Sequence, residues 1–415
     1  MGIQIFLGLL ACCCLTFVNA DLEGYKIYDI TPCNAFEQHI LEDMDRIKGY
    51  DFLHRPRALN VSSRVMVGPK DQNDIESTLT KLAVNFTIFN DDVSKSINRE
   101  RIQNGKVRSL SRGISFTNFQ RFDQINAYLD ELAVRYPDRV KVENVGKSYE
   151  GRQLKTITIS NGDRRPNKNV IWIDGGIHAR EWIAPAAVLY VIQQLAENFQ
   201  VNKDILTRYD FVILPVVNPD GYEYTHTRER MWRKTRRPTA FGCPGTDGNR
   251  NFDFHWGEVG VSNSACDETF KGQKAFSEPE TQIVRDQLLK LKGRAKFYLA
   301  IHAFGNYILY PWAWTTAPSP NAASLAEVAN AGAYAIQAAT GTRYTVGQPS
   351  KVFYAAAGGV DDWAYGVAGI PICITMELPG AGSTGFDPFP QHILPIVSET
   401  WIGIKAMIQK VISKF

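Results

Sequence analysis

One stretch, Val170 to Ala186, reads VIWIDGGIHAREWIAPA and joins a strand to a helix. Its first four residues are apolar and largely β-branched, and the run VIWID predicts a buried strand. Directly after that strand, His178 and Glu181 stand three residues apart, where both side chains can converge on one point. Zinc binds imidazole nitrogen and carboxylate oxygen at about 2.0–2.2 Å, and a catalytic zinc site takes three protein ligands. His302, which follows the apolar run KFYLAI, is the best candidate for the third ligand.

The histidine and glutamate pattern has low specificity when it is taken alone. A single H-x-x-E match is a common chance event, and a single histidine is more often a packed residue. The chain lacks H-E-x-x-H, so it does not carry the helical zinc-protease pattern. A metal site therefore needs support from the rest of the chain.

Length and composition set the broad class of the protein. A chain of 415 residues predicts one large and one small domain. Hydrophobic residues make up 44% of it, and the plentiful aromatics and balanced charge argue against disorder. The formal net charge is only +3, so we expect no nucleic-acid partner.

The first 20 residues are predicted to be a signal peptide. The segment from Ile3 to Val18 carries no charge, and the small residue Ala20 suits cleavage after it. A membrane anchor is the alternative, but about 16 apolar residues are fewer than the about 20 that a membrane span needs. We therefore expect a secreted, extracellular protein with no membrane association.

Loss of the signal peptide leaves four cysteines, and secretion would allow disulfides among them. The four are Cys33, Cys243, Cys266 and Cys373. Spacing alone leaves their pairing open. Asn60 and Asn85 begin N-x-S/T triplets, which are patterns typical of glycosylation acceptors.

Residues 21–112 are predicted to form a separate small domain. Strand-like and helix-like runs alternate there in a β-α-β-β-α-β-like order, which is typical of a ferredoxin-like α+β domain. The segment GKVRSLSRGISF, residues 105–116, has no periodicity and reads as a linker at the end of this region that a trypsin-like protease could cut, after Arg108 or Arg112. An ordinary basic loop is the alternative.

Residues 113–415 alternate strands and helices, which predicts an α/β domain with a mixed central sheet flanked by helices. The predicted strands are RVKVENV, LKTITIS, VIWID, DFVILPVV, AKFYLAIHA and ICITMEL. The predicted helices are FDQINAYLDELAVRY, PAAVLYVIQQLAEN, EPETQIVRDQLLKLK, NAASLAEVANAGAYAIQAAT and HILPIVSETWIGIKAMIQK. Ligands of such sheets gather at the carboxyl ends of strands. Four polar residues stand at or just after predicted strand ends: His178, Asn218, His302 and Glu377.

Six motifs in order resemble the zinc carboxypeptidases of the pancreatic A/B type. They are GIHAREW, WRKTRR, GTDGNRNF, AIHAFGNYILYPW, VFYAAAGGVDDWAYG and TMELPGAG. The resemblance covers the whole chain, because residues 21–112 also resemble that family's inhibitory pro-segment. It implies a zinc carboxypeptidase fold, an enzyme made as a zymogen, and one Zn²⁺ per chain held by His178, Glu181 and His302.

The resemblance also implies roles for residues around the metal. Glu377 would be the general base that takes a proton from zinc-bound water and later passes it to the leaving amine. Arg233 would stabilise charge on the scissile carbonyl oxygen, whereas Arg236 and Arg237 are expected to be surface charges. Asp247 would accept the other N–H of the first zinc-binding histidine.

An enzyme that removes C-terminal residues must bind a free carboxylate, and arginine does this with two parallel hydrogen bonds. By resemblance, Asn249 and Arg250 would bind that carboxylate, and Tyr354 would close over it. Arg180 would contact the substrate further from the bond that is cut.

The residue released is predicted from the position just before a shared Asp-Trp pair. A-type enzymes carry an aliphatic residue there and B-type enzymes carry aspartate; this chain has Asp361, followed by Asp362, which is expected to be structural. A carboxylate in the pocket would attract lysine or arginine and reject apolar side chains. Val360, beside Asp361 in the sequence, and Ala313, near the expected pocket wall, could broaden this preference. The alternative for Asp361 is an aspartate at the N-terminus of a helix.

The predicted protein is thus a secreted zymogen of a B-type metallocarboxypeptidase, with Cys243 and Cys266 paired as in the resembling family. Its expected partners are peptide and protein C-termini, an activating trypsin-like protease and its own pro-segment as inhibitor, and a monomer is expected. The alternatives are an A-type enzyme, a regulatory carboxypeptidase that trims prohormones, and a non-catalytic binding protein on the same fold.

Overall fold

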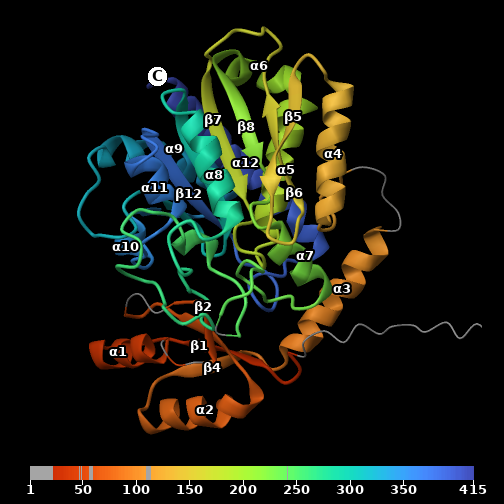
Figure 1. Cartoon of the computed structure of the whole chain (residues 1–415). Helices are drawn as coiled ribbons and strands as arrows, with labels where there is room; N and C mark the ends of the chain where they lie inside the picture. Colours follow the sequence, from red (N-terminus) through yellow and green to blue (C-terminus); the bar gives the residue numbers. More distant parts are fainter. Residues whose placement is uncertain (1–21, 46, 48, 56–58, 109–113, 241) are drawn as a thin grey trace, which may run out of the picture.

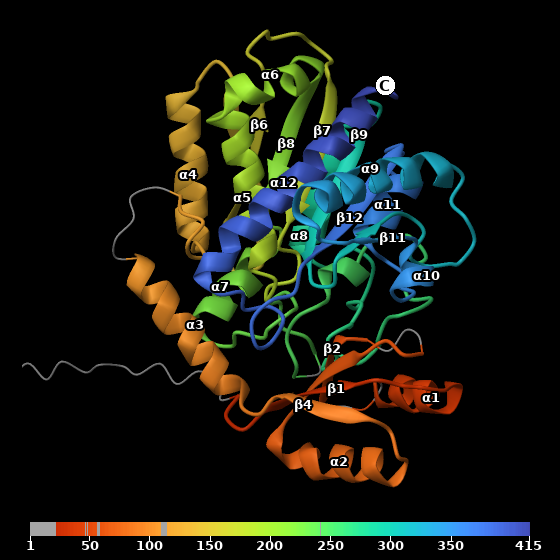
Figure 2. The same ribbon diagram turned by 180° about the vertical axis from the view of Figure 1, so that it is seen from behind.

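The computed structural model describes residues 22–45, 47, 49–55, 59–108, 114–240 and 242–415. A small N-terminal domain, red to orange, lies against one end of a larger domain (Figures 1 and 2). The predicted signal peptide, residues 1–20, and the candidate cleavage residue Arg112 lie outside the described residues. Arg108, the other candidate, is the last residue of helix α3 (Val93–Arg108).

The small domain, called the pro-domain below, has a four-stranded antiparallel sheet in the order β2-β3-β1-β4. Its elements are β1 (Lys26–Ile30), α1 (Ala35–Met44), β2 (Tyr50–His54), β3 (Ser63–Val67), η1 (Pro69–Asp71), α2 (Gln72–Lys81) and β4 (Phe86–Asn90), followed by α3. This order confirms the ferredoxin-like α+β prediction. Strand β2 was not among the runs that the sequence pattern identified.

The two faces of the pro-domain sheet bury different partners, because successive residues of a strand point to opposite sides. Tyr28 and Ile30 of β1 pack with residues of α1 and α2. Ile27 of β1 and Met66 of β3 point the other way and pack with Phe386 of the large domain. The sheet therefore uses its second face to dock onto the rest of the protein.

The large domain has an eight-stranded mixed sheet in the order β11-β10-β12-β9-β7-β8-β6-β5. Its central strands β12, β9, β7 and β8 are parallel, whereas β10 runs antiparallel to β12 and β6 runs antiparallel to β8 and β5. The strands are β5 (Val140–Lys147), β6 (Gln153–Ile159), β7 (Asn169–Gly175), β8 (Tyr209–Leu214), β9 (Ala295–Ala303), β10 (Tyr307–Leu309), β11 (Thr345–Gly347) and β12 (Ile372–Leu378).

Helices cover both faces of this sheet, so its central strands carry apolar residues on both faces. Ile171 and Ile173 of β7 belong to the core that holds α4, α5, α9 and α12, while Trp172 between them belongs to the core with α8 and α11. The helical elements are α4 (Phe122–Arg135), α5 (Ile183–Ala196), α6 (Phe199–Arg208), α7 (Pro219–Thr227), η2 (Gly248–Arg250), α8 (Pro279–Lys290), α9 (Ala322–Thr340), α10 (Pro349–Val352), α11 (Val360–Gly366) and α12 (Pro390–Ile412).

The six strands and five helices predicted for the large domain are all present. They are β5, β6, β7, β8, β9 and β12, and α4, α5, α8, α9 and α12. The short strands β10 and β11 and the helices α6, α7, α10 and α11 were not predicted. None of the helices in the described ranges is long and apolar enough to cross a membrane.

The parallel strands bring the predicted site residues to one edge of the sheet. Glu377 of β12 lies opposite His302 of the neighbouring strand β9. His178 follows shortly after the end of β7, which is the strand on the other side of β9. The carboxyl ends of these three strands therefore meet at the place where ligands bind in such sheets.

Candidate metal centre and substrate cleft

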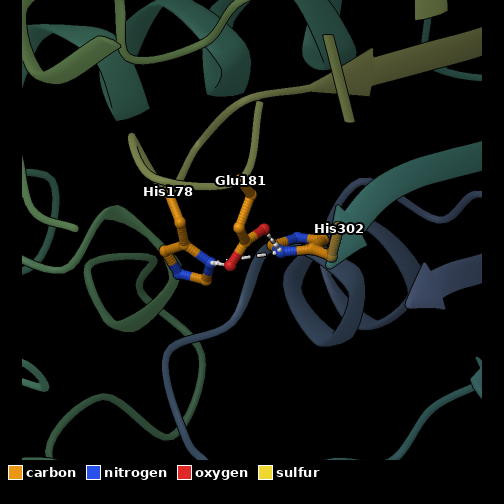
Figure 3. Close-up of side chains that lie close together, drawn as sticks. All are labelled: His178, Glu181 and His302. Atoms are coloured by element: carbon orange, nitrogen blue, oxygen red, sulfur yellow. Dashed lines mark hydrogen bonds and ion pairs between the residues drawn. The ribbon is translucent and has the colours of Figure 1, made fainter. Parts of the chain in front are cut away.

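Two imidazoles and one carboxylate converge at this edge. His178 Nδ1 lies 2.8 Å from Glu181 Oε1, and His302 Nδ1 lies 3.1 Å from Glu181 Oε2 (Figure 3). The two Nδ1 atoms face each other at 3.2 Å. All three residues are buried, and their ligand atoms lie within 4.8 Å of one another. This donor set, with two imidazole nitrogens aimed at one point beside a carboxylate, fits a zinc ion.

The ionisable groups of this cluster shift one another's pKa. Burial alone would raise the pKa of Glu181, but the two histidines hold it below its ordinary value. Burial would lower the pKa of His302, but Glu181 raises it to about 9. The carboxylate therefore stays ionised inside the protein, and its negative charge is what a divalent ion would neutralise.

Asp247 links this cluster to an arginine. Its Oδ1 accepts from His178 Nε2 at 3.1 Å, and its Oδ2 accepts from Arg233 Nη2 at 2.9 Å. Nη1 of the same guanidinium lies 3.7 Å from Glu181 Oε1, so Arg233 lies next to a candidate metal ligand. With His178 Nε2 engaged by Asp247, Nδ1 is the nitrogen that points toward the other candidate ligands.

Glu377 stands beside the candidate metal ligands without belonging to the cluster. Burial raises the pKa of its carboxyl to about 8, although His302 and Arg233 act in the opposite direction. It lines the same cavity as His178 and Glu181. A carboxyl with a pKa near neutrality beside a metal cluster can exchange protons there.

The cavity has a volume of about 1020 Å³ and is walled by both domains. Arg250 and Tyr354 line it on the large-domain side, and the guanidinium of Arg250 lies 5.6 Å from the Tyr354 ring. Arg250 gives two hydrogen bonds to backbone carbonyls, but its buried Nη2 has no hydrogen-bond partner in the described part of the chain. An unpaired guanidinium nitrogen in this wall is suited to bind an anion.

Asn249 and Asp361 are not among the described residues that line this cavity. Asn249 Oδ1 accepts from the backbone N–H of Val360 at 3.0 Å. Asp361, in the first turn of α11, is buried, and the nearest side-chain hydrogen bond comes from Thr375 at 3.5 Å. Its neighbour Asp362 instead accepts from the backbone of the loop at Ala313, as expected for a structural residue.

Two carboxylates of the pro-domain form ion pairs with the large domain, and one of them, Asp51, lines the cavity. Asp51 of β2 pairs with Arg180, with Nη1–Oδ2 and Nη2–Oδ1 distances of 2.6 and 3.4 Å. Glu100 of α3 pairs with Arg230, with distances of 2.6 and 3.1 Å. Arg55 adds a contact over the ring of Tyr354 at 5.5 Å. Both ion pairs join the two domains. Pro-domain residues also line the cavity that contains His178 and Glu181, so the pro-domain covers the approach to the candidate metal site.

Sequence reasoning missed Arg230 and its partner Glu100. The signal was present, because Arg230 begins the same run, RMWRKTRR, that contains Arg233. The expectation that Arg236 is a surface charge was wrong: its side chain is only 16% exposed and lies over the Tyr224 ring at 3.6 Å. A guanidinium packs well on an aromatic face, which explains its burial. Arg237 is exposed, as expected, and donates to a backbone carbonyl.

Cys243 and Cys266 form a disulfide, the pairing that the resemblance implied. The bridge closes the segment that carries Asp247 and Arg250. Cys33 is exposed and Cys373 is buried, and neither is in a disulfide.

Comparisons with known proteins agree with this geometry. The family described as "Zinc carboxypeptidase" matches residues 125–403, and "Carboxypeptidase activation peptide" matches residues 28–100. Carboxypeptidase B of Helicoverpa zea is 39% identical over 96% of both chains. Carboxypeptidase B of Astacus astacus is 43% identical over 71% of this chain and 97% of its own.

A solved structure extends the likeness to the whole fold. Carboxypeptidase A of Helicoverpa armigera superposes with a TM-score of 0.89 at 31% identity and covers 94% of this chain and 98% of its own. The relatives thus carry both B and A names. The chain belongs to the zinc carboxypeptidase family, with zinc as its cofactor and an activation peptide ahead of the enzyme domain.

Proposed function

We propose that this metallocarboxypeptidase releases lysine and arginine from the C-termini of peptides and proteins. The observation that carries the proposal is the carboxylate of Asp361. It is 6% exposed, and no lysine or arginine pairs with it in the part of the chain that is described. A buried carboxylate without a cation is costly, and a basic substrate side chain would supply the missing charge.

The reaction is hydrolysis of the last peptide bond. Zinc held by His178, Glu181 and His302 would polarise the scissile carbonyl and activate water. Glu377 takes a proton from the attacking water and gives it to the amine nitrogen when the C–N bond breaks. Arg233 donates to the oxygen of the scissile carbonyl as negative charge develops there.

Other side chains of the cleft hold the substrate. Arg250 and Asn249 bind the terminal carboxylate, for which the unpaired Nη2 of Arg250 is available. Tyr354 closes over that carboxylate from the cavity wall. Arg180 binds the substrate further from the scissile bond once Asp51 has left it.

The pro-domain acts as the enzyme's own inhibitor in this proposal. A trypsin-like protease would cut after Arg108 or Arg112, which separates the pro-domain from the enzyme domain. The protein would be secreted after removal of residues 1–20 and would act as a monomer. Support comes from the two ion pairs that fasten the pro-domain across the cleft.

The alternative function is that of an A-type enzyme, because a similar solved structure is named carboxypeptidase A. The test treats the purified zymogen with trypsin and compares blocked dipeptides that end in Arg or in Phe, with and without a zinc chelator. Fast release of Arg that the chelator stops, with little release of Phe, supports the proposal. A preference for Phe would contradict the basic specificity, and no activity with zinc bound would support the binding-protein alternative.

A further inference from the structure

Glu278 is a buried carboxylate that the reaction described above does not use. It occupies the N-cap position of α8 without a side-chain capping hydrogen bond, and it is 1% exposed. Its Oε2 accepts from Thr235 Oγ1 at 2.8 Å, and its Oε1 accepts from Thr246 Oγ1 at 3.1 Å and from Ser277 Oγ at 2.8 Å. No lysine or arginine forms an ion pair with it among the described residues. Three hydroxyl donors thus take the place of a counter-charge.

The two threonines also bind each other. Thr235 N–H donates to the carbonyl of Thr246 at 2.9 Å, and Thr246 N–H donates to Thr235 Oγ1 at 2.9 Å. The segments that carry them therefore run side by side, and the carboxylate of Glu278 binds to both segments through the two threonine hydroxyls. Both threonines are buried, so each lost hydrogen bond would leave a polar group without water.

These segments carry the arginine and the aspartate of the proposed site. Arg233 lies two residues before Thr235, and Asp247 directly follows Thr246. The ion pair between Arg233 and Asp247 therefore spans the same two segments that Glu278 holds together. Asp247 in turn binds His178, so a shift of the Thr246 segment would change the position of a candidate metal ligand.

We propose that Glu278 is a positioning residue, which sets the distance between Arg233 and Asp247 and thereby the orientation of His178. The inference rests on the proposed function, because it concerns the residues that stabilise charge and hold the metal. Changes to groups that orient metal ligands typically lower metal affinity or activity about 10- to 100-fold. A residue that only stabilised the fold would change neither quantity in the folded, zinc-loaded enzyme.

The test compares Glu278→Gln with Glu280→Gln in the trypsin-activated enzyme. Glu280 is equally buried and two residues away, but its carboxylate accepts from the backbone of Tyr149 and binds neither threonine. Glu278→Gln is expected to lower kcat about 10-fold or more per zinc-loaded molecule, with a smaller change in KM, and to weaken zinc binding about 10-fold. Glu280→Gln should leave kcat and the zinc dissociation constant within about twofold of the unmodified enzyme.

A second pair of variants covers the case in which Glu278→Gln does not fold. Thr246→Val removes a hydroxyl donor to Glu278 that makes no other hydrogen bond among the described residues, and Thr246→Ser keeps that donor. The proposal expects loss of kcat and of zinc affinity in the valine variant and recovery in the serine variant. Equal values for both, or a Glu278→Gln enzyme with normal kcat and zinc affinity, would overturn it. Zinc affinity is measured without turnover, so failure of the proposed function, seen as inactivity of the unmodified enzyme, remains distinguishable.

Discussion

Asp51 of the pro-domain holds Arg180 of the enzyme domain with both carboxylate oxygens, although Arg180 itself is almost wholly buried. The contact covers an arginine that the active enzyme is proposed to use for substrate. In the proposed zymogen, inhibition would therefore follow from occupation of a substrate-binding group and not only from a blocked entrance.

Replacement of Asp51 by alanine should raise the peptidase activity of the uncut zymogen. Arg180 would keep its buried charge without its partner, and loss of one partner of a buried ion pair costs on the order of 3 kcal/mol. The Asp51 side chain is 19% exposed, so we expect a smaller effect, of about tenfold, on the activity of the uncut zymogen. Rates of hydrolysis of a small blocked dipeptide before trypsin treatment measure it.

Asp29→Ala is the matched control for that prediction. Asp29 forms a comparable pair with Arg64, at 2.7 Å for both contacts, but both residues belong to the pro-domain. Its loss should lower the stability of the pro-domain without a comparable rise in activity at 25 °C. Equal leakage from the two variants would show that the Asp51 contact has no special inhibitory role.

Asp361→Ile should reverse the choice of C-terminal residue. The variant removes the buried negative charge that a basic side chain would meet, so kcat/KM for Arg should fall about 100-fold and kcat/KM for Phe should rise. Asp362→Asn is the control, because Asp362 accepts from the loop at Ala313 and should change stability but not the Arg to Phe ratio. An unchanged ratio in the Asp361 variant would remove the basis for the basic specificity.

Loss of the disulfide should lower stability. The Cys243–Cys266 bridge closes a loop with a sequence separation of 23, for which chain entropy predicts about 3 kcal/mol. The Cys243→Ser, Cys266→Ser double variant should therefore melt several degrees lower than the unmodified protein, as followed by calorimetry. Cys33→Ser, at an exposed cysteine outside the disulfide, should melt like the unmodified protein.

Glu280 should make stability depend on pH. Burial raises the pKa of its carboxyl to about 8 in the folded protein, while the unfolded chain releases the proton near pH 4.5. Between these values the unfolded state binds fewer protons, so the free energy of unfolding falls as pH rises. Each pKa unit corresponds to about 1.4 kcal/mol, which makes the full loss on the order of 3–5 kcal/mol.

Glu280→Gln removes this titration. The difference in free energy of unfolding between the variant and the unmodified protein should therefore grow in favour of the variant from about pH 4.5 to about pH 8. Urea unfolding at several pH values measures this difference. A difference that stays constant across the window would mean that Glu280 does not hold its proton in the folded state.

Long periodic segments and ligand chemistry made much of this protein predictable. VIWID alternates between two buried faces, and β7 is the strand that it forms. His178, Glu181 and His302 were predicted because imidazole and carboxylate after strand ends suit zinc. The ordered motifs then supplied Asp247, which alternation and ligand spacing alone would not have identified.

The parts that sequence reasoning missed depend on tertiary contacts. Strand β2 reads YDFLH, which is short and has charged or polar residues at three of its five positions, so its pattern is weak. It is a strand because β3 pairs with it, and it carries the Asp51 that reaches Arg180. The helix α7 starts in the turn-like run NPDG and forms because Asn218 caps its N-terminus.

Because of the apolar face of the pro-domain sheet, we expect cleavage of the linker and release of the pro-domain to be two separate steps. Ile27 and Met66 pack in one cluster with Phe386, and a cut after Arg108 or Arg112 would break neither contact. In the proposed activation, proteolysis would thus convert a tethered inhibitor into a bound one, and the onset of activity would depend on how fast the two pieces part. A dilute secretion would then switch on more completely than a concentrated one from the same number of cuts.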